Sequence, residues 1–514
     1  MSLSLKLMLE EAAGRYKEKT AIVFGDRRLS YTDLDEASNK VANALIKMGV
    51  NKGDRIAMLL SNSPEFVITY FGIVKTGAIA VPLDTQYKVY ELASIFDSAL
   101  PKVLVTESPT LETLIPILSR FQFIKHVIDL SAKYEGQFLS YQEIMRVSSA
   151  QSIEVELVPE DIAHIGYTSG SSFRPRGVML SHRSLVTEAA ISGDGFRQTD
   201  KDIVMLFALP MYHVFGLVTV LLTSINKGST VVIVPGTGLS ISSFMAAIER
   251  ERGTMFPGVP YIFALAVDMA ERGAVKNDLS SLRLCASCGA PLPVDVIKRF
   301  KQHYGFNIVD CLGLTEAVCH VTCLPINGSG KLGSVGKTLP GWEVNIVDDN
   351  GRELPPNQAG EIIIRGPIMK GYYNNLQATA ETIKDGWLYT GDVGKIDEDG
   401  NLFLNGRKKD IIIVKGQNIS PSDIESVLYT HPKVADAAVI GIPDEMRGEV
   451  VGAVISLKEG KVATEQEIKR FCLERIASYK VPRQVIFLDS LPKTDGAKID
   501  KGSIREQLSI PSLF

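Results

Sequence analysis

The stretch RIAMLLSNSPEFVITYFGIVKTGAIAVPL, residues 55–83, contains the structural unit that the chain repeats. RIAMLLSN is an apolar run that ends in polar residues, and SPEFVITYFGIVKTG has helical spacing and closes on Gly77. AIAVPL follows as a short strand-like run, and KVLVTE, FIKHVIDL, STVVIVPG and LRLCAS are similar runs elsewhere in the chain. Short buried runs that alternate with helices are typical of parallel sheets covered on both faces, so about the first 400 residues are predicted to be α/β.

The pattern of the sequence changes twice toward the C-terminus. From about residue 332, GSVGKTLPGWEVNIVDDNGRELPPNQAGEIIIRGP is rich in turns and has period-2 runs, which predicts a small antiparallel β region. After GRKKD, the runs IIIVKG, SPSDIESVLYTHP and VADAAVIGIPD give a β-α-β pattern, with Ser420 and Pro421 as the predicted N-cap and first helical residue. We therefore expect one domain at 1–405, a connection at 406–410 and a C-terminal domain at 411–514.

The composition is that of a globular protein without a general affinity for polyanions. The chain has 514 residues, of which 45% are hydrophobic and 22% charged, and its length suggests two to four domains. Its formal charge is −4, from 55 basic and 59 acidic residues, which gives no bias toward nucleic acid or an anionic membrane. Any anion-binding site must therefore be built locally.

We expect neither a secretory signal nor an integral membrane segment. Glu10 and Glu11 come too early for the apolar core of a signal peptide. The most apolar window, 203–225, contains Pro210, His213 and Gly216, which predicts a buried strand, a loop and then a helix. The C-terminal PSLF is not a recognised address signal, so the cytoplasm is the expected location.

Six cysteines are too few for a disulfide framework in a chain of 514 residues. Cys285 and Cys288 form a C-x-x-C pair, and Cys311, Cys319 and Cys323 follow. These residues could be a zinc site or small buried residues of strands, since free cysteine behaves as a small apolar residue. The second cluster lacks a matching C-x-x-C, which favours buried strand residues.

The segment YTSGSSFRPRGVMLSH, which begins at Tyr167, has the composition of a phosphate-binding loop. Gly170 permits close approach of the backbone, and Arg174 and Arg176 supply positive charge. The Walker A spacing is absent. By its own residues, the segment is either an ordinary loop or a phosphate site made of backbone N–H groups and hydroxyls. The candidate hydroxyls belong to Thr168, Ser169, Ser171 and Ser172.

Further residues with chemical potential follow in a fixed order along the chain. Taken singly, a histidine in an apolar setting is usually a core residue, and a lone glutamate is usually on the surface. The candidates are His213 in LPMYHVFG, Gly289, Ala290 and Pro291 in SCGAPLP, Thr315 and Glu316 in CLGLTE, Asp392 in YTGD, Arg407 and Lys409 in GRKKD, Gly416 in IVKGQNIS, and Lys498 in LPKTDGAKIDK.

With these motifs in this order, the chain resembles the adenylate-forming enzymes, which include acyl-CoA synthetases, the adenylation domains of peptide synthetases and firefly luciferase. The resemblance runs from SYTDLDEASNKVANAL at 30–45 to Lys498. It implies a large N-terminal domain of two parallel-rich αβαβα subdomains and a small β-barrel, the latter at about 332–405. It also implies a small mobile α+β C-terminal domain that is joined at a hinge, Lys409.

The resemblance implies a reaction in two halves. A carboxylate first attacks the α-phosphate of ATP, giving an acyl-adenylate and pyrophosphate, and a thiol, usually that of CoA, then displaces AMP. Lys498 matches the lysine that reaches between the carboxylate and the α-phosphate, and Glu316 matches the Mg²⁺ ligand. In the second half, the C-terminal domain rotates and presents the loop of Gly416 to the pantetheine channel.

The remaining nucleotide-side residues are assigned by the same match. Thr315 is implied to contact the α-phosphate, and Asp392 to accept hydrogen bonds from both ribose hydroxyls beside Arg407. Thr168 and His213 are expected to join Lys498 and Glu316 in catalysis. The expected ATP-binding set is Thr168, Ser169, Gly170, Ser171, Ser172, Arg176, Gly289, Ala290, Pro291, Leu312, Gly313, Thr315, Glu316, Asp392, Arg407 and Lys498.

The sequence departs from the family pattern mainly on the nucleotide side. Phe173 replaces a glycine of the phosphate loop, and a bulky residue disfavours positive φ, so Phe173→Gly is expected to raise turnover. Arg176 replaces a lysine, and Leu312 replaces a tyrosine that stacks on adenine. Cys288 and Ala497 each replace a glycine. These changes leave open a protein that binds acids or nucleotides with weak turnover.

The expected acid is fatty or aromatic. Gly216 stands near the position where peptide-synthetase domains have an aspartate for the substrate amine, so no amine anchor is expected. The candidate acyl-pocket residues are Tyr212, Val214, Phe215, Gly258 and Val259, with Ala290 nearby. The acceptor is expected to be CoA, with a carrier-protein thiol as the alternative, and the oligomeric state, monomer or homodimer, stays open.

Overall fold

The computed structural model describes residues 3–131, 133–134, 136–168, 176–234, 240–290, 292–407, 411–492 and 499–510. The stretch 55–83 forms β3 (Arg55–Leu59), α3 (Pro64–Lys75) and β4 (Ile79–Pro82), and the two strands are parallel neighbours. Ser63 caps the helix by accepting from the Phe66 N–H at 3.2 Å, and Gly77 has a φ of +77° beyond the helix end. The predicted strand–helix–strand unit is confirmed.

The unit at 55–83 belongs to a seven-stranded sheet. All strands of this sheet are parallel to their neighbours except the last, which pairs antiparallel with β8. In spatial order the strands are β7 (Leu139–Ser140), β6 (His126–Asp129), β5 (Val103–Thr106), β3, β4, β8 (Ile162–Thr168) and β9 (Arg176–Ser181).

A second sheet of nine strands has a parallel centre and antiparallel edges. In spatial order its strands are β16 (Lys337–Thr338), β15 (His320–Cys323), β14 (Ile308–Gly313), β13 (Leu284–Ser287), β12 (Met255–Gly258), β10 (Ile203–Leu206), β11 (Thr230–Ile233), β1 (Thr20–Phe24) and β2 (Arg27–Ser30).

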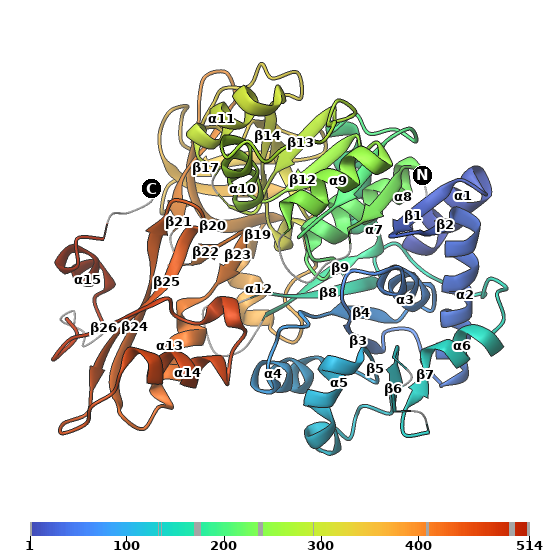
Figure 1. Cartoon of the computed structure of the whole chain (residues 1–514), viewed down its shortest axis with the longest axis horizontal. Helices are drawn as coiled ribbons and strands as arrows, with labels where there is room; N and C mark the ends of the chain where they lie inside the picture. Colours follow the sequence, from blue (N-terminus) through green and yellow to red (C-terminus); the bar gives the residue numbers. More distant parts are fainter. Residues whose placement is uncertain are drawn as a thin grey trace.

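Helices connect and cover the strands of these two sheets (Figure 1). Those of the N-terminal part, besides α3, are α1 (Leu5–Tyr16), α2 (Tyr31–Lys47), α4 (Val89–Ala99), α5 (Ser108–Leu114), α6 (Tyr141–Val147), α7 (His182–Gly195), α8 (Thr223–Lys227), α9 (Ile241–Glu251), α10 (Pro260–Glu271), α11 (Val294–Tyr304) and α12 (Leu376–Thr382), with shorter or irregular turns η1 (Ile115–Arg120), η2 (Phe215–Leu222) and η3 (Thr315–Ala317).

The predicted antiparallel region forms a five-stranded sheet, but it begins later than the sequence pattern suggests. The strands are β17 (Glu343–Val347), β18 (Gly360–Arg365), β20 (Trp387–Ile396), β19 (Ile383–Lys384) and β21 (Leu402–Arg407). The preceding strand, β16, pairs instead with β15 of the nine-stranded sheet, through Thr322 and Thr338. The turn-rich stretch from 332 onward therefore contributes strands to two different sheets.

The C-terminal part has its own sheet, with helices on both faces. Its strands are β23 (Gln417–Ile419), β22 (Ile412–Val414), β25 (Gly448–Leu457), β24 (Val434–Asp444) and β26 (Gln484–Phe487). Its helices are α13 (Pro421–Tyr429), which begins at the predicted N-cap Ser420, α14 (Glu465–Leu473), the short turn η4 (Ser478–Lys480) and α15 (Lys501–Gln507). The predicted fold class is confirmed, whereas the hinge residue Lys409 lies outside the described residues.

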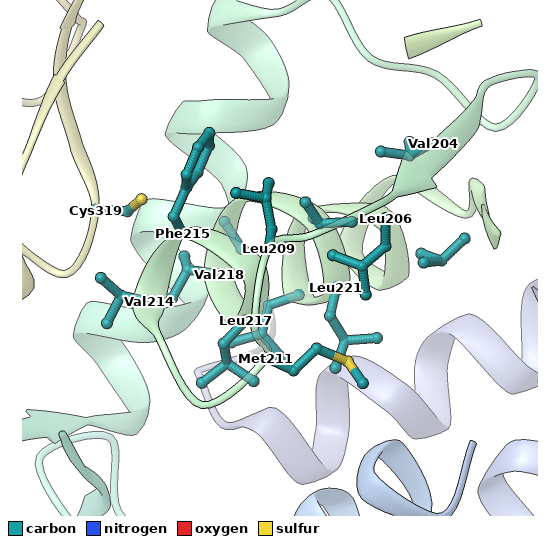
Figure 2. Packing of buried hydrophobic residues seen from close by; sticks show 14 of the residues in the cluster. Val204, Leu206, Leu209, Met211, Val214, Phe215, Leu217, Val218, Leu221 and Cys319 are labelled. Carbon is teal, nitrogen blue, oxygen red and sulfur yellow. The ribbon is translucent and has the colours of Figure 1, made fainter. Parts of the chain in front are cut away.

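The apolar window at 203–225 lies in the core, as predicted. It forms β10, a loop, and then η2 and α8, and Figure 2 shows the buried side chains of this window packed against one another. The Leu217 and Leu221 side chains are fully buried, and each contributes about 1.5–3 kcal/mol of transfer free energy. None of the described helices is long and apolar enough to cross a membrane.

All six cysteines are buried and free. Burial raises the pKa of the Cys285 and Cys288 thiols, which keeps both protonated at neutral pH. The Sγ atoms of Cys311 and Cys323 lie 2.9 Å apart on paired strands. Within the described part of the chain, no group of three or more His, Cys, Asp or Glu side chains is placed to hold a metal ion.

Candidate active site

A cavity of about 1030 Å³ lies where the two large sheets, the five-stranded sheet and the C-terminal domain meet. It brings together residues that are more than 200 positions apart in the sequence. The predicted residues on its wall are Thr168, Arg176, Tyr212, His213, Phe215, Val259, Gly289, Thr315, Glu316, Asp392 and Gly416. Their convergence on one cavity makes it the candidate active site.

Part of the wall is built at the carboxyl ends of parallel strands. Thr168 ends β8 of the seven-stranded sheet, and Val259 and Gly289 follow β12 and β13 of the nine-stranded sheet. Thr315 and Glu316 follow β14, the next strand along. In parallel α/β sheets, the crevice outside these strand ends is where ligands bind, because the connecting loops converge there.

Arg176 lies directly opposite Thr168 in the β8–β9 pair, so the candidate phosphate loop connects two adjacent strands. The loop itself, with Ser169, Gly170, Ser171, Ser172 and Phe173, lies outside the described residues. The Arg176 guanidinium carbon lies 5.2 Å from the centre of the Tyr372 ring, within the range of a cation–π contact. The positive charge of Arg176 therefore faces the cavity at the end of this strand pair.

Tyr372 was not found from the sequence, and it joins two of the predicted residues. Its hydroxyl donates to the Glu316 Oε1 at 3.0 Å, and its ring lies under Arg176. Burial, followed by the neighbouring Glu316 carboxylate, raises the pKa of Tyr372, so the hydroxyl stays protonated and able to donate. The sequence GYYNN gives no indication of this role. Tyr372 is placed at the site by the fold, through an isolated β-bridge with Val178 of β9.

Glu316 lies in the short turn η3, where its carboxylate borders the cavity. Its neighbour Thr315 packs against β8, since a Cβ added to Gly166 would lie 3.3 Å from the Thr315 Cγ2. This contact fixes the end of β14 against the end of β8. The Glu316 carboxylate, the Tyr372 hydroxyl and the Arg176 guanidinium lie close together, which suits a bound polyphosphate and its cation.

Asp392 is almost fully buried at 6% exposure, on β20 of the five-stranded sheet. The strand register places it directly opposite Arg407 of β21. Asp392 and Arg407, which are expected to lie side by side at the ribose, are therefore backbone neighbours. The Arg407 side chain lies outside the described atoms. The adjacent turn is held by Glu361, whose Oε1 accepts from the Gly391 N–H at 3.1 Å.

His213 is neutral, and its tautomer follows from its contacts. Burial lowers the pKa of His213 to about 4, so the imidazole is uncharged at pH 7. Its Nδ1 accepts from the Phe215 N–H at 3.3 Å, which leaves the proton on Nε2. The side chain borders the cavity, where it can act as a neutral hydrogen-bond donor.

The predicted acyl-pocket residues divide into wall and support. Tyr212, Phe215 and Val259 border the cavity, whereas Val214 is buried in the core and does not. Gly258 supports the wall, because a Cβ there would lie 3.1 Å from the Phe256 ring. The wall is therefore aromatic and aliphatic at this end.

Gly216 also borders the cavity, and the structure explains why it carries no side chain. A Cβ at this position would lie 2.4 Å from the Pro210 carbonyl oxygen, a distance at which the backbone must shift. An acidic side chain cannot be accommodated here without such a shift. The packing against Pro210 therefore requires a residue without a side chain at this position.

Three predicted adenine-side residues lie away from the described wall. Leu312 is 7% exposed in the core, and it is Leu314 that borders the cavity. A Cβ at Gly313 would lie 2.4 Å from the Cys319 carbonyl oxygen, so close backbone approach requires this glycine. Ala290 is only partly buried and is not among the wall residues, and Pro291 lies outside the described part.

The loop of Gly416 is a tight hairpin turn inserted against the N-terminal domain. Lys415 and Gly416 connect β22 to β23 with φ values of +52° and +83°, as a type I′ turn requires. A Cβ added to Gly416 would lie 2.6 Å from the Val259 Cγ1, and its carbonyl oxygen lies 3.5 Å from the Cβ position of Gly289. The Lys415 ammonium lies 4.6 Å from the centre of the Tyr261 ring.

Lys498 lies outside the described residues, but those on either side of its segment are placed. The Asp500 N–H donates to the Pro492 carbonyl at 2.9 Å, which closes the ends of the segment together. Leu491 and Ile499 pack in an apolar cluster with Ile504 of α15. This cluster is separate from the one that contains Ile419 and Val414, which flank the Gly416 turn.

The fold and the site together define an adenylate-forming enzyme. The chain belongs to the AMP-binding enzyme family, because the model described as AMP-binding enzyme matches residues 9–373. The model described as AMP-binding enzyme C-terminal domain matches residues 423–498. The chain is 32% identical to a long-chain-fatty-acid–CoA ligase of Bacillus subtilis, over 98% of this chain and 94% of that protein. It is 35% identical to 4-coumarate–CoA ligase 3 of Oryza sativa subsp. japonica, over 93% and 87%.

Solved structures of similar proteins have the same fold. A double mutant of o-succinylbenzoate CoA synthetase (MenE) from Bacillus subtilis, bound with its product analogue OSB-NCoA, matches with a TM-score of 0.86 and 29% identity over 97% of this chain and 98% of that chain. The anthranilate CoA ligase AuaEII in complex with anthranoyl-AMP matches with a TM-score of 0.76 and 30% identity over 99% and 98%.

Proposed function

We propose that the chain is an ATP-dependent acyl-CoA synthetase that converts a carboxylic acid to an acyl-adenylate and then to an acyl-CoA. The observation that carries this proposal is the cavity itself. One part of its wall holds Thr168, Arg176, Glu316 and Asp392, and another holds the Gly416 turn of the C-terminal domain. The similarity to CoA ligases over nearly the whole chain supports the same activity.

In the first half-reaction, the residues near Arg176 neutralise the charge of the triphosphate. Arg176 grips phosphate oxygens, and Thr168 donates from its hydroxyl at the start of the loop. Glu316 would hold Mg²⁺, which prefers a few carboxylate ligands together with phosphate oxygens and would withdraw charge from those oxygens. The hydrogen bond that the Tyr372 hydroxyl donates to Oε1 orients the Glu316 carboxylate for this role.

Lys498 and His213 act on the oxygens of the reacting carboxylate and α-phosphate. Lys498 supplies the positive charge that stabilises the transferring centre, and Thr315 contacts the same phosphate. Because His213 is neutral and carries its proton on Nε2, it donates a hydrogen bond to the carboxylate and takes no proton from it. Asp392 orients the nucleotide through the ribose hydroxyls, with Arg407 beside it.

The second half-reaction takes place with the C-terminal domain in the position that it has here. The contact of Gly416 with Val259 places a bare backbone turn at the acyl end of the cavity, which leaves room for a pantetheine arm. A match to a complex with a CoA-product analogue, at a TM-score of 0.86, agrees with this assignment. Rotation about 406–410 brings Lys498 in for the first half-reaction.

The substrate is a fatty or aromatic acid without an α-amino group. The wall beside His213 is formed by Tyr212, Phe215 and Val259, and a side chain at Gly216 itself would require a backbone shift. The named activities of the similar proteins, on long-chain fatty acids and 4-coumarate, belong to this chemical class.

A panel of carboxylic acids tests the proposal. Pyrophosphate release is measured with ATP and Mg²⁺ for saturated fatty acids of several lengths, benzoate, 4-coumarate and amino acids, with and without CoA. We expect CoA-dependent thioester formation with fatty or aromatic acids and none with amino acids. Accumulation of acyl-AMP that CoA does not discharge would instead indicate a carrier-protein acceptor. Binding without pyrophosphate release would contradict enzymatic function.

A further inference from the structure

A buried ion pair joins the two domains at the edge of the cavity, where Lys480 forms part of the wall. Glu91, in the first turn of α4, accepts from the Lys480 ammonium at 2.7 Å and from the Ala477 N–H at 2.9 Å. Both side chains are nearly inaccessible, with 8% of Lys480 and 10% of Glu91 exposed. The two residues are 389 positions apart, so this contact exists only because the C-terminal domain is docked in this orientation.

The surroundings of Lys480 keep its ammonium charged in the interface. Its Nζ lies 5.0 Å from the centre of the Tyr87 ring and 4.0 Å from the Asp423 Oδ2. Burial lowers the pKa of Lys480, but Tyr87, Glu91 and Asp423 raise it more, so the pKa lies above its ordinary value. Removal of either Glu91 or Lys480 would leave the other charge buried without its partner, so the contact is sensitive to loss of either side chain.

Glu91 also has a function within its own domain that does not need the C-terminal domain. Its Oε2 accepts from the Lys88 N–H at 3.1 Å, as the third residue of a capping box at the start of α4. The acceptor is therefore held in place before the C-terminal domain arrives. Only Ala477 and Lys480 must be brought to it.

The face that docks through Lys480 is the one that carries the Gly416 turn. Ala437 and Val439 of β24 pack with α13 and α14 on this face, and the residues around the turn belong to the same cluster. Ala438 and Ile440 point to the opposite face, where they pack with Ile499 beside the Lys498 segment. In Figure 1, α14 lies toward α4, whereas α15 lies at the outer edge of the molecule.

We infer that Glu91 and Lys480 are positioning residues that hold the C-terminal domain in the thioester-forming arrangement, and that they act as an electrostatic latch for the second half-reaction alone. This inference rests on the proposed function. Because the pair is formed in one docked state, it lowers the free energy of that state and leaves the chemistry of adenylation untouched. A second junction contact is consistent with this role, since Tyr212 and Tyr479, one from each domain, both face the buried carboxyl of Asp84.

Three variants separate the latch from a general effect on folding. Glu91→Gln keeps an acceptor for the Lys88 and Ala477 N–H groups but removes the charge, Lys480→Met keeps the aliphatic stem, and the double variant removes both charges. Arg120→Met is the control, because Arg120 pairs with Asp97 of the same helix α4 at 2.6 Å, but within one domain and exposed. The acid is one that the wild-type enzyme adenylates in the panel.

Single-turnover rates give the first readout. Each single variant is expected to form acyl-AMP at the wild-type rate and to discharge it to CoA about tenfold more slowly or worse, a tenfold change being about 1.4 kcal/mol. The double variant is expected to be no worse than the poorer single variant, since both remove one interaction. Equal loss of both half-reactions, or additive losses, would overturn the latch. So would a loss confined to Lys480→Met, which would indicate direct contact of Lys480 with CoA.

Amide hydrogen exchange gives a second readout that needs no substrate. Because the Ala477 N–H donates to Glu91 across the interface, its peptide is expected to exchange faster in Lys480→Met and at the wild-type rate in Arg120→Met. Unchanged exchange in Lys480→Met would contradict the latch even if the proposed activity proved wrong. A wild-type enzyme that makes no thioester, combined with faster exchange in the variant, would reject the proposed function and with it the latch's part in thioester formation, and would retain only the docking contact between Glu91 and Lys480.

Discussion

At the residue scale, the role of His213 depends on its surroundings more than on its identity. The LPMYHVFG motif gives a histidine in an apolar setting, which by itself is as consistent with a core residue as with a catalytic one. The contact from the Phe215 N–H to Nδ1 and the pKa of about 4 indicate a neutral imidazole at the cavity wall, with its proton on Nε2. The sequence could not provide either fact, because both come from burial.

Protonation of His213 should not limit adenylation at physiological pH. Its folded pKa is about 4, below the ordinary value of 6.5, so the neutral form that donates from Nε2 is present above about pH 5 and is lost only as the pH falls through 4. We expect His213→Ala to slow acyl-AMP formation by about 10–10²-fold. Between pH 5.5 and 8, the rate of acyl-AMP formation should depend on pH in the same way in the wild type and in His213→Ala. An inflection near pH 6.5 that disappears in His213→Ala would show that the imidazole titrates normally.

Lys498 should matter for the first half-reaction only. Lys498→Ala is expected to slow acyl-AMP formation by about 10²–10⁴-fold, because it removes the charge that stabilises the transferring phosphoryl centre. Discharge of synthetic acyl-AMP to CoA should stay near the wild-type rate. Measured separately, the two half-reactions should therefore diverge, and acyl-AMP formation at the normal rate would remove Lys498 from the mechanism.

At the element scale, the β22–β23 hairpin is the element of the C-terminal domain to which the proposed function assigns the pantetheine channel. Its two turn residues both have positive φ, and Gly416 has no space for a side chain against Val259. IVKGQNIS suggested the position of the turn through family resemblance, but not the contact with Val259. The antiparallel region shows the same limit, since the period-2 pattern located the strands but could not assign β16 to the nine-stranded sheet, a choice made by packing.

Gly416→Ala is expected to impair thioester formation while leaving acyl-AMP formation within about twofold of wild type. The added Cβ would lie 2.6 Å from the Val259 Cγ1, and the φ of +83° adds strain. Gly460→Ala is a matched control, because Gly460 has a φ of +70° in the same domain and nothing within 4 Å of its Cβ position. Rates of the two half-reactions give the comparison, and equal effects of both substitutions would show that backbone strain alone is responsible.

At the scale of the whole molecule, the proposed function requires two domain arrangements to alternate around one cavity. The motif order predicted which segments meet there, and the structure brings most of them together. The residues that join the domains, Glu91 and Lys480 above all, belong to no motif and are far apart in the sequence. Their pairing follows from the docking of two folded surfaces, which is why sequence patterns did not find it.

Restricting the connection between the domains should separate the half-reactions. Lys409→Pro fixes φ at the predicted hinge, and we expect acyl-AMP formation to be retained and thioester formation to be lost. The measurement is the yield of acyl-AMP and of acyl-CoA from the same reaction. Equal loss of both products would show that residues 406–410 are not the axis of the movement.

The most direct test of the two-step account is a chase of enzyme-bound acyl-AMP with CoA. The enzyme is incubated with ATP, Mg²⁺ and an accepted fatty or aromatic acid, free nucleotide is removed, and CoA is added. The account predicts that pyrophosphate appears before CoA is added, and that CoA then converts the bound acyl-AMP to acyl-CoA and AMP in equal amounts. Absence of acyl-AMP before the chase, or acyl-AMP that CoA leaves intact, would contradict it.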